Sequence, residues 1–383
     1  MKIVRTYKYK LKPSKTVIVK FEHCLSVCRE VYNSGLQERR DAWQLERKSI
    51  SFYDQSRQLP QIKKIREDVA EVQSQVLQNI LRRLERTFQA FFKRIKKGEK
   101  AGYPRFKNEK RFNSFTYPQM KNAFHLVGNK LTLSKIGSVR LHLSREIAGK
   151  IKTCTIKREV SGWFVFFMVE QEVEPLPKID NSIGLDMGIE NFLTMSDGTQ
   201  IENPRFFEHC QKEIRVAQRR VARRQKDSNR RRKSVIQIGK LYEKIKNSRN
   251  DFQHKISRTL VNDFDFIAIE NLNIVGMSKG FLAKQVSDVA WGNFFRKLLY
   301  KAESAGREVV EINPSGTSQT CVCGHRVEKT LNMRWHQCSN CGLSCHRDIV
   351  SAQVILNRAV GQTVKALSKS IELLAFESSL LNC

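Results

Sequence analysis

The spacing of apolar residues divides the first part of the chain into a strand and a helical block. Residues 3–12 (IVRTYKYKLK) alternate between apolar and polar positions as far as Pro13, which predicts a strand. From about residue 15 to 98 the period becomes helical. Its clearest part is a stripe of apolar residues spaced by three or four positions: Val72, Val76, Ile80, Leu84, Phe88, Phe91 and Ile95. A block of helices therefore follows the first strand.

Short alternating segments return between residues 123 and 173. They are KLTLSKI, SVRLHL, KTCTIKRE and WFVFFMVEQEV. Because turn residues interrupt them, they predict a small β-barrel or sandwich. We expect the opening strand to join it, which makes the helical block an insertion. Pro175 and Pro177 then mark a linker.

Strands and helices alternate beyond this linker. A hairpin is predicted around Gly188, from residues 183–187 and 192–196. Further apolar strands are predicted at 264–270 (FDFIAIE) and 307–312 (REVVEI). Helical periods occupy the remaining parts, at 211–258, 283–304 and 346–358. Such alternation predicts an α/β domain, interrupted by a cysteine-rich segment.

The charge of the chain points to a polyanionic partner. Lys and Arg number 69 against 38 Asp and Glu, for a net charge of +31 among 383 residues. Seventeen cations and four acids between residues 211 and 258 account for +13 of this surplus. The 40% hydrophobic content and 22 Phe argue against disorder, so a folded nucleic-acid-binding protein is predicted.

Two basic segments leave alternatives open. Beside the apolar stripe, the cations of residues 82–97 are either a solvated helix face or a phosphate-binding one. Residues 98–118 mix Phe and Tyr with Lys and Arg, which suits base stacking on single-stranded nucleic acid or a structural linker with inward aromatics. The N-terminus lacks the apolar core of a signal peptide and no run approaches 18 apolar residues, so no membrane association and a cytoplasmic location are expected.

A metal module is predicted from the cysteines. Cys321 and Cys323 precede Gly324, and Cys338 and Cys341 precede Gly342, with fourteen residues between the two cysteine pairs. Short Cys pairs at this distance fit a zinc ribbon in which four thiolates hold one structural Zn²⁺. The first pair is C-x-C, one residue tighter than the usual C-x-x-C. A neighbouring residue therefore remains an alternative ligand: His325, His336, Cys345 or His346.

Three carboxylates stand at the ends of predicted elements. Asp186 and Glu270 end apolar strands, and Asp348 opens a helix after the cysteines. A carboxylate at the edge of a buried strand is costly unless it is paired or binds a metal. Brought together, the three would hold two Mg²⁺ ions about 3.5 to 4 Å apart, the arrangement that hydrolyses phosphodiesters.

The ordered set of motifs resembles the TnpB family, transposon-encoded proteins with a split RuvC core that are relatives of the type V CRISPR effectors. The second half contributes GLDMGIENFLTMSDG, FIAIENLNI, NPSGTSQTC with the paired cysteines, and HRDIVSAQVIL. The first half contributes YKYKLKPS, CREVYNSGLQERR, GYPRFKNEKRFNSFTYPQ and WFVFFMVEQEV. The resemblance extends to about residue 360. The tail of 361–383 has no matching motif and is assigned no role.

The resemblance implies an RNA-guided, Mg²⁺-dependent DNA endonuclease. A guide RNA from the transposon end would pair with target double-stranded DNA, next to a short motif that the protein reads. Asp186, Glu270 and Asp348 match the three RuvC acids and would bind the catalytic Mg²⁺ ions. The protein would act in a prokaryotic cytoplasm as a monomer or dimer on its RNA, associated with the nucleoid when bound to DNA.

The same resemblance implies a multi-domain α/β and β fold. Residues 1–12 plus 100–178 would form a β-barrel wedge domain, and 15–98 a helical recognition domain. Residues 180–360 would form an RNase H-like RuvC nuclease domain with a zinc ribbon at 313–345. One departure is that the family's D-x-N-A-A motif is replaced after Asp348 by Ile, Val, Ser and Ala.

Two other functions remain compatible with these residues. A transposase with an RNase H fold that joins DNA strands directly would use the same three acids. A regulator derived from TnpB would bind DNA through its RNA without cutting. Such regulators are expected to lack a RuvC acid, whereas this chain retains all three.

Overall fold

The computed structural model describes residues 1–120, 122–330 and 333–361, which form two compact units. The first spans Lys2–Glu172, and the second runs from Val173 onward together with Met1. Almost all of the expected C-terminal tail, from residue 362, lies outside the described residues. Among the described helices, none combines the length and apolar character needed to cross a bilayer.

The first unit is built on a seven-stranded antiparallel sheet with the order β2-β6-β7-β1-β5-β4-β3. Its strands are β1 (Lys2–Lys12), β2 (Ser114–Tyr117), β3 (Phe124–Val127), β4 (Lys130–Leu133), β5 (Gly137–His142), β6 (Lys150–Glu159) and β7 (Gly162–Glu172). The opening strand lies between β7 and β5, with Thr6 opposite Met168 and Leu11 opposite Leu141. It thus joins strands that follow it by a hundred residues and more, as the sequence pattern predicts. The described strands β2 and β3 end the ladder.

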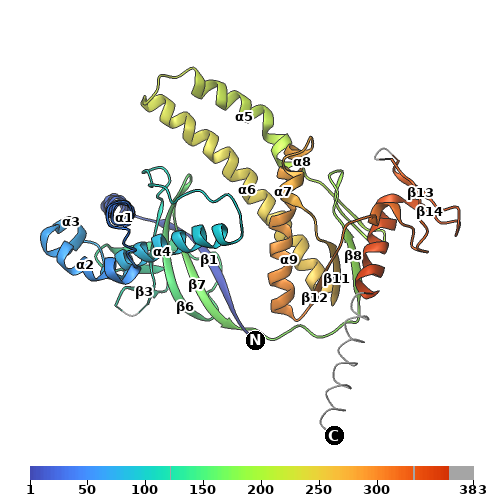
Figure 1. Ribbon diagram of the computed structural model, residues 1–383, viewed down its shortest axis with the longest axis horizontal. Helices are drawn as coiled ribbons and strands as arrows, with labels where there is room; N and C mark the ends of the chain where they lie inside the picture. The colour runs from blue at the N-terminus through green and yellow to red at the C-terminus, as the bar shows by residue number, and fades with distance from the viewer. Residues whose placement is uncertain (121, 331–332, 362–383) are drawn as a thin grey trace, which may run out of the picture. The chain divides into compact units, whose positions relative to one another are not determined.

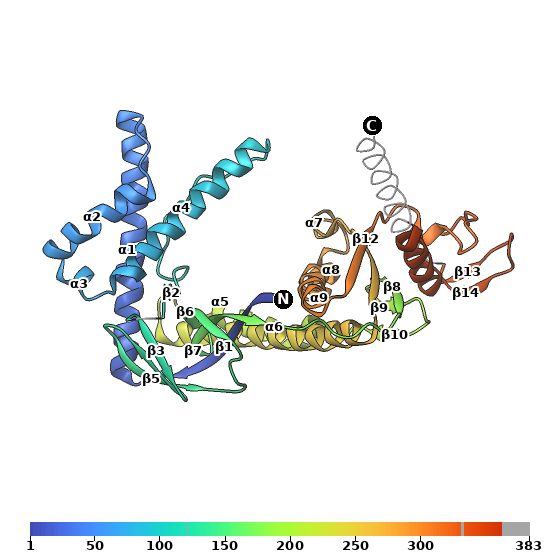
Figure 2. The same cartoon turned by 90° about the horizontal axis from the view of Figure 1, so that it is seen from below.

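Four helices separate β1 from the rest of this sheet, and α2, α3 and α4 lie on one side of it (Figure 2). They are α1 (Lys15–Glu46), α2 (Phe52–Ile65), α3 (Glu67–Ala70) and α4 (Ser74–Lys96). The predicted apolar stripe is buried along α4 from Val76 to Phe88. It then leaves the core, because Ile95 in the last turn is 50% exposed.

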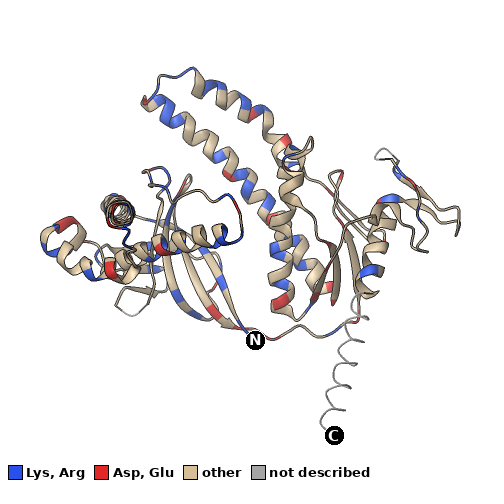
Figure 3. Cartoon of the chain, in the orientation of Figure 1, with Lys and Arg blue, Asp and Glu red and all other residues tan. Residues whose placement is uncertain are grey.

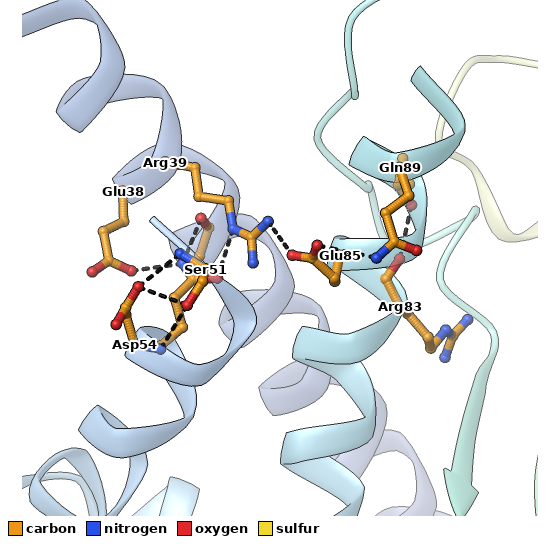
Figure 4. A network of polar contacts seen from close by, with 10 residues as sticks. Glu38, Arg39, Ser51, Asp54, Arg83, Glu85 and Gln89 are labelled. Carbon is orange, nitrogen blue, oxygen red and sulfur yellow. Dashed lines mark hydrogen bonds and ion pairs between the residues drawn. The ribbon is translucent and has the colours of Figure 1, made fainter. Parts of the chain in front are cut away.

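A buried arginine connects three of these helices (Figure 4). The Arg39 guanidinium donates hydrogen bonds to Gln55 Oε1 at 2.9 Å and to Glu85 Oε2 at 2.7 Å. It also lies 5.2 Å from the centre of the Phe88 ring. Gln55 in turn donates to the Gly35 carbonyl and to Glu38. Arg39 therefore holds α1, α2 and α4 together through its Nε and Nη1 atoms, while its buried Nη2 has no hydrogen-bond partner.

Replacing Arg39 by alanine is expected to destabilise this unit by about 3 kcal/mol, because Glu85 and Gln55 lose a partner that is only 6% exposed. Urea unfolding followed by circular dichroism measures the change. Arg40→Ala is the matched control, because the neighbouring Arg40 is exposed on the same helix. If Arg39→Ala and Arg40→Ala lowered the free energy of unfolding equally, this result would show that the Arg39 network contributes little to stability.

The second unit is built on a five-stranded mixed sheet with the order β10-β9-β8-β11-β12. Its strands are β8 (Ser182–Asp186), β9 (Asn191–Met195), β10 (Gln200–Glu202), β11 (Phe266–Glu270) and β12 (Glu308–Ile312). The hairpin β8–β9 is antiparallel, whereas β8, β11 and β12 run parallel. The carboxyl ends of β8, β11 and β12 consequently meet at one edge.

Helices cover both faces of this sheet (Figure 1). On one face, Ile183, Leu185, Ile267 and Ile269 pack against residues of α6 (Asn229–Asp263) and α9 (Trp291–Ala305). On the other face, Ala268 packs with Ile355 and Ala359 of the helix formed by residues 347–361. Side chains alternate between faces along a strand. Asp186 and Glu270 therefore belong to the face of the 347–361 helix.

Two expected helices are broken in the structure. The stretch 211–258 forms α5 (Phe206–Ala222) and α6, because Asp227 adopts a positive φ of 66° and Ser228 caps the next helix by accepting from Arg231 N–H. The stretch 283–304 forms α8 (Ala283–Val289) and α9, separated by Ala290 with φ 55°. A short helix, α7 (Ile274–Met277), lies before them. Apolar spacing continues across Ala290 and so did not reveal the second break, whereas residues 223–234 around the first break are all polar or charged.

Candidate functional site

The three predicted acids meet at one edge of the mixed sheet. Leu185 of β8 lies opposite Ile269 of β11, so the next residues, Asp186 and Glu270, end adjacent parallel strands. Both point to the face that the 347–361 helix covers, and Asp348 lies in the first turn of that helix. Ligands of open α/β sheets bind at the carboxyl ends of the strands, which is where this edge lies.

A glycine allows the 347–361 helix to approach the sheet. A Cβ atom on Gly184 would lie 2.1 Å from the Ala352 carbonyl oxygen and 2.9 Å from Leu356 Cβ. Any side chain at this position would push the helix away from β8. Gly184 stands two residues before Asp186, so the close contact brings Asp348 to the same edge as the strand acid.

The electrostatics of this edge favour a bound cation. Burial, followed by the negative charges of Glu270 and Asp348, raises the pKa of Asp186 to about 8, while Arg347 acts in the opposite direction. Burial also raises the pKa of Glu270, against the effect of the Thr317 hydroxyl and of Arg358. Carboxylate oxygens are the ligands that Mg²⁺ prefers, so the donor set fits this ion.

Replacing Asp186 by asparagine is expected to stabilise the Mg²⁺-free protein. Since folding raises the pKa of this group from 3.8 to about 8, the folded state keeps a proton that the unfolded state releases. Wild-type stability should fall as the pH rises through this window, so the advantage of Asp186→Asn grows from about pH 4 to pH 8, to a few kcal/mol at roughly 1.4 kcal/mol per pKa unit. Urea unfolding at pH 5 and pH 8 measures it.

The exposed Asp197, which follows β9, provides the control Asp197→Asn. The free energy of unfolding of that variant should differ from that of the wild type by the same small amount at pH 5 and at pH 8. If the difference in free energy of unfolding between Asp186→Asn and the wild type were the same at pH 5 and pH 8, this result would contradict the raised pKa of Asp186.

The four predicted cysteines form a second group. The sulfur atoms of Cys321, Cys323, Cys338 and Cys341 all lie within 4.8 Å of one another. Cys321 and Cys341 are 3.6 Å apart and Cys323 and Cys338 are 3.8 Å apart. Zn–S bonds of about 2.3 Å in a tetrahedron place sulfurs about 3.8 Å apart. Over the described ranges, no other group of Cys, His, Asp or Glu ligand atoms lies this close together. The carboxylates of Asp186, Glu270 and Asp348 are therefore more widely spaced than these four sulfur atoms.

The two cysteine turns explain how the short C-x-C pair is accommodated. Cys321 N–H donates to the His325 carbonyl, whereas Cys338 N–H donates to the Leu343 carbonyl, one residue further along. Gly324 and Gly342 follow the second cysteine of each pair with φ of 87° and 74°, which disfavours other residues. The first turn thus closes one residue earlier and still presents both thiols.

Backbone amides lower the pKa of two of these thiols, whereas the pKa of Cys321 is raised by burial and that of Cys341 is also raised. The N–H of His325 lowers the pKa of Cys323 to about 6, and the N–H groups of Cys341 and Asn340 lower that of Cys338. The alternative ligands His325, His336, Cys345 and His346 are not in the four-sulfur group. By contrast, Cys24 and Cys154 lie in the core of the first unit, where their pKa values are raised, and act as small apolar residues.

The helices α5 and α6 form a basic hairpin. They fold back on each other, and Lys and Arg follow both (Figure 3). Arg224 links the two by donating to the Arg230 carbonyl at 2.6 Å. Most of the +13 charge of residues 211–258 lies on this hairpin, which makes it a candidate surface for phosphate backbones.

Sequence reasoning did not assign roles to three residues around the acids. Thr317 donates a hydrogen bond to Glu270, Arg358 lies near Glu270, and Arg347 lies near Asp186 and Asp348. Thr317 belongs to the quoted motif NPSGTSQTC, and Arg347 directly precedes Asp348. Their motifs were therefore visible, but the contacts depend on how the chain folds.

Three family profiles match parts of the chain. OrfB_IS605, described as "Probable transposase", matches residues 166–280, and the Cas12f1-like TNB domain matches residues 291–355. A helix-turn-helix domain of OrfB_IS605 matches residues 1–48, which in this structure form the strand β1 and the single helix α1.

Whole-chain comparisons find similar proteins in bacteria. A "Putative RNA-guided DNA endonuclease" of Streptomyces pristinaespiralis is 32% identical over 381 residues, covering 96% of this chain and 92% of that protein. A "Putative RNA-guided DNA endonuclease InsQ" of Escherichia coli K12 is 29% identical over 393 residues, with 97% and 96% covered. The solved mini-RNA-guided endonuclease CRISPR-Cas_phi3 has a similar fold, with a TM-score of 0.54, 10% identity, and 93% and 92% covered.

Proposed function

The chain belongs to the TnpB (OrfB_IS605) family, and on this premise we propose that it is an RNA-guided, Mg²⁺-dependent DNA endonuclease encoded by a transposon. Family membership confirms the resemblance that the motifs indicated. The relatives that match almost the whole chain carry the name RNA-guided DNA endonuclease, which supports this activity. The substrate would be DNA that matches the guide and lies beside a short flanking motif.

The convergence of the three acids is the observation that carries this proposal. Asp186, Glu270 and Asp348 come from two parallel strands and one helix, far apart in sequence, and turn to the same edge of the sheet. An antiparallel hairpin followed by two parallel strands supports an RNase H-like, RuvC-type nuclease domain over 180–360. The convergence favours a cutting enzyme over a regulator that only binds.

Each acid has a role in the proposed reaction. Asp186 lies close to both other acids, and the three carboxylates would together hold the Mg²⁺ ions. Bound there, Mg²⁺ would activate water and neutralise the developing negative charge during phosphodiester hydrolysis. Because the pKa of Asp186 is raised, this carboxyl would release a proton on binding the cation.

The remaining domains are proposed to handle nucleic acid. The sheet of residues 1–12 plus 100–178, as a wedge domain, and the helices of 15–98, as a recognition domain, would read the flanking motif. The α5–α6 hairpin and other basic surfaces would hold the RNA and its duplex with DNA. Base pairing then supplies the sequence specificity, while protein cations contact the backbone.

Sequencing the RNA that co-purifies with the protein tests the guide. We expect a discrete species derived from the 3′ flank of the gene itself. A mixture of unrelated cellular RNAs, without enrichment of that flank, would contradict RNA guidance and would leave only nonspecific binding by a basic protein.

A further inference from the structure

Thr317 is the buried hydrogen-bond partner of one proposed metal ligand. The residue is 4% exposed, and its hydroxyl donates to Glu270 Oε1 at 2.5 Å. The same oxygen lies 3.0 Å from the Pro314 carbonyl oxygen, which is also an acceptor. A glutamate side chain has several rotamers open to it, so the hydroxyl restricts the direction of this carboxylate.

The turn that carries Thr317 is fixed from the 347–361 helix. This turn is the 3₁₀ helix η1 (Thr317–Gln319), which follows β12. Arg358 donates to the Ser315 carbonyl at 2.7 Å and to Thr320 Oγ1 at 3.2 Å. Thr320 Oγ1 donates in turn to the Gly316 carbonyl at 2.7 Å. The helix that presents Asp348 thus also holds the loop beside Glu270.

The cysteine module fixes the other end of the same turn. Val327 N–H donates to the Gln319 carbonyl at 2.8 Å, and Thr320 forms an antiparallel bridge with Arg326. Both contacts come from the residues that directly follow the first cysteine pair. Thr317 is consequently held from two sides, and its hydroxyl has little freedom to leave the carboxylate.

We propose that Thr317 is a positioning residue, whose hydroxyl fixes the Glu270 carboxylate in the direction that metal binding requires. This inference rests on the proposed function. Partners that orient metal ligands change metal affinity by about 10- to 100-fold when they are removed. Thr317 would not contact the DNA or the ions itself. Its effect would therefore appear as weaker metal binding that a higher metal concentration overcomes.

Titration with Mn²⁺, followed by electron paramagnetic resonance, tests this role in the full-length protein with its RNA. Thr317→Val keeps the shape of the side chain but lacks the hydroxyl, and should bind Mn²⁺ about 10-fold more weakly or worse. Thr317→Ser keeps the hydroxyl and should bind it nearly as well as the wild type. Ser318→Ala is the matched control from the same turn, and should stay near the wild type because the Ser318 hydroxyl makes none of the contacts described for Thr317, Glu270 or Arg358. Cleavage by Thr317→Val should recover as Mg²⁺ is raised.

The outcomes separate this inference from the function on which it rests. Equal Mn²⁺ affinity in Thr317→Val and the wild type would overturn the positioning role and leave the nuclease proposal standing. If the Asp186→Ala variant bound Mn²⁺ as well as the wild type does, this result would contradict the nuclease proposal itself. Should Thr317→Val fail to fold, Thr317→Ala makes the same comparison with a smaller side chain, and an affinity equal to the wild type would again overturn the role.

Discussion

Asp186→Ala is expected to lower guide-directed DNA cleavage by about 10³-fold or more, because it removes the carboxylate that lies between the other two acids. On the proposed mechanism, Glu270 and Asp348 alone would not suffice to hold two Mg²⁺ ions. Binding of RNA and of matched DNA should remain nearly unchanged, since the basic surfaces lie elsewhere on the chain. Cleavage of labelled DNA and gel-shift binding measure the two properties separately.

Asp197→Ala is the matched control for this experiment. Asp197 lies in the turn between β9 and β10 of the same sheet, and its exposed side chain accepts from the Thr199 N–H. The Asp197→Ala variant should cleave guide-matched DNA at the wild-type rate. Retention of cleavage in Asp186→Ala would show that this acid is not catalytic, and an equal loss of binding would show that it is structural.

Loss of zinc is expected to unfold the cysteine module. The first cysteine turn precedes the β13 (Trp335–Gln337) and β14 (Ser344–His346) pair and the second connects these two strands, which form the only sheet of the module within the described residues. Zinc binding contributes about 10–16 kcal/mol to the folding of small zinc domains. Cys338→Ser should therefore lower the melting temperature of the second unit and the zinc content, which should be about one ion per chain in the wild type.

Cys210→Ser is the control for this substitution, because Cys210 is partly exposed on α5 and outside the four-sulfur group. Its zinc content and melting temperature should match the wild type. A folded wild-type protein that contains no zinc by elemental analysis would contradict a structural metal here.

The meeting of the three acids at one edge of the sheet could be predicted from the sequence to a useful degree. Apolar runs that end in Asp186 and Glu270 indicate strand ends, and parallel strands bring such ends to one edge. The arrival of Asp348 depends on Gly184, whose missing side chain lets a helix approach β8. Nothing local in the sequence distinguishes this glycine from one that serves a turn.

The details that were missed depend on tertiary contacts or on single residues. The apolar period runs through Ala290, whose positive φ breaks one expected helix, whereas the polar run of residues 223–234 around Asp227 was a local signal of the other break that the prediction did not use. The short C-x-C pair left the identity of the fourth zinc ligand undecided in the sequence. The structure shows that the first cysteine turn closes one residue earlier than the second, so that both thiols still reach the group. Thr317 meets Glu270 across 47 residues of sequence, a contact that only the folded chain reveals.

Cutting by a transposase that joins strands would not depend on a guide, and a regulator would not cut at all. The most direct test is therefore cleavage by the purified protein with its co-purified RNA. DNA that matches the guide beside the flanking motif is offered with Mg²⁺, together with DNA of equal length and scrambled sequence. The account predicts double-strand or single-strand breaks only in the matched DNA. Cutting of both DNAs at similar rates, or of neither by RNA-loaded protein, would contradict it.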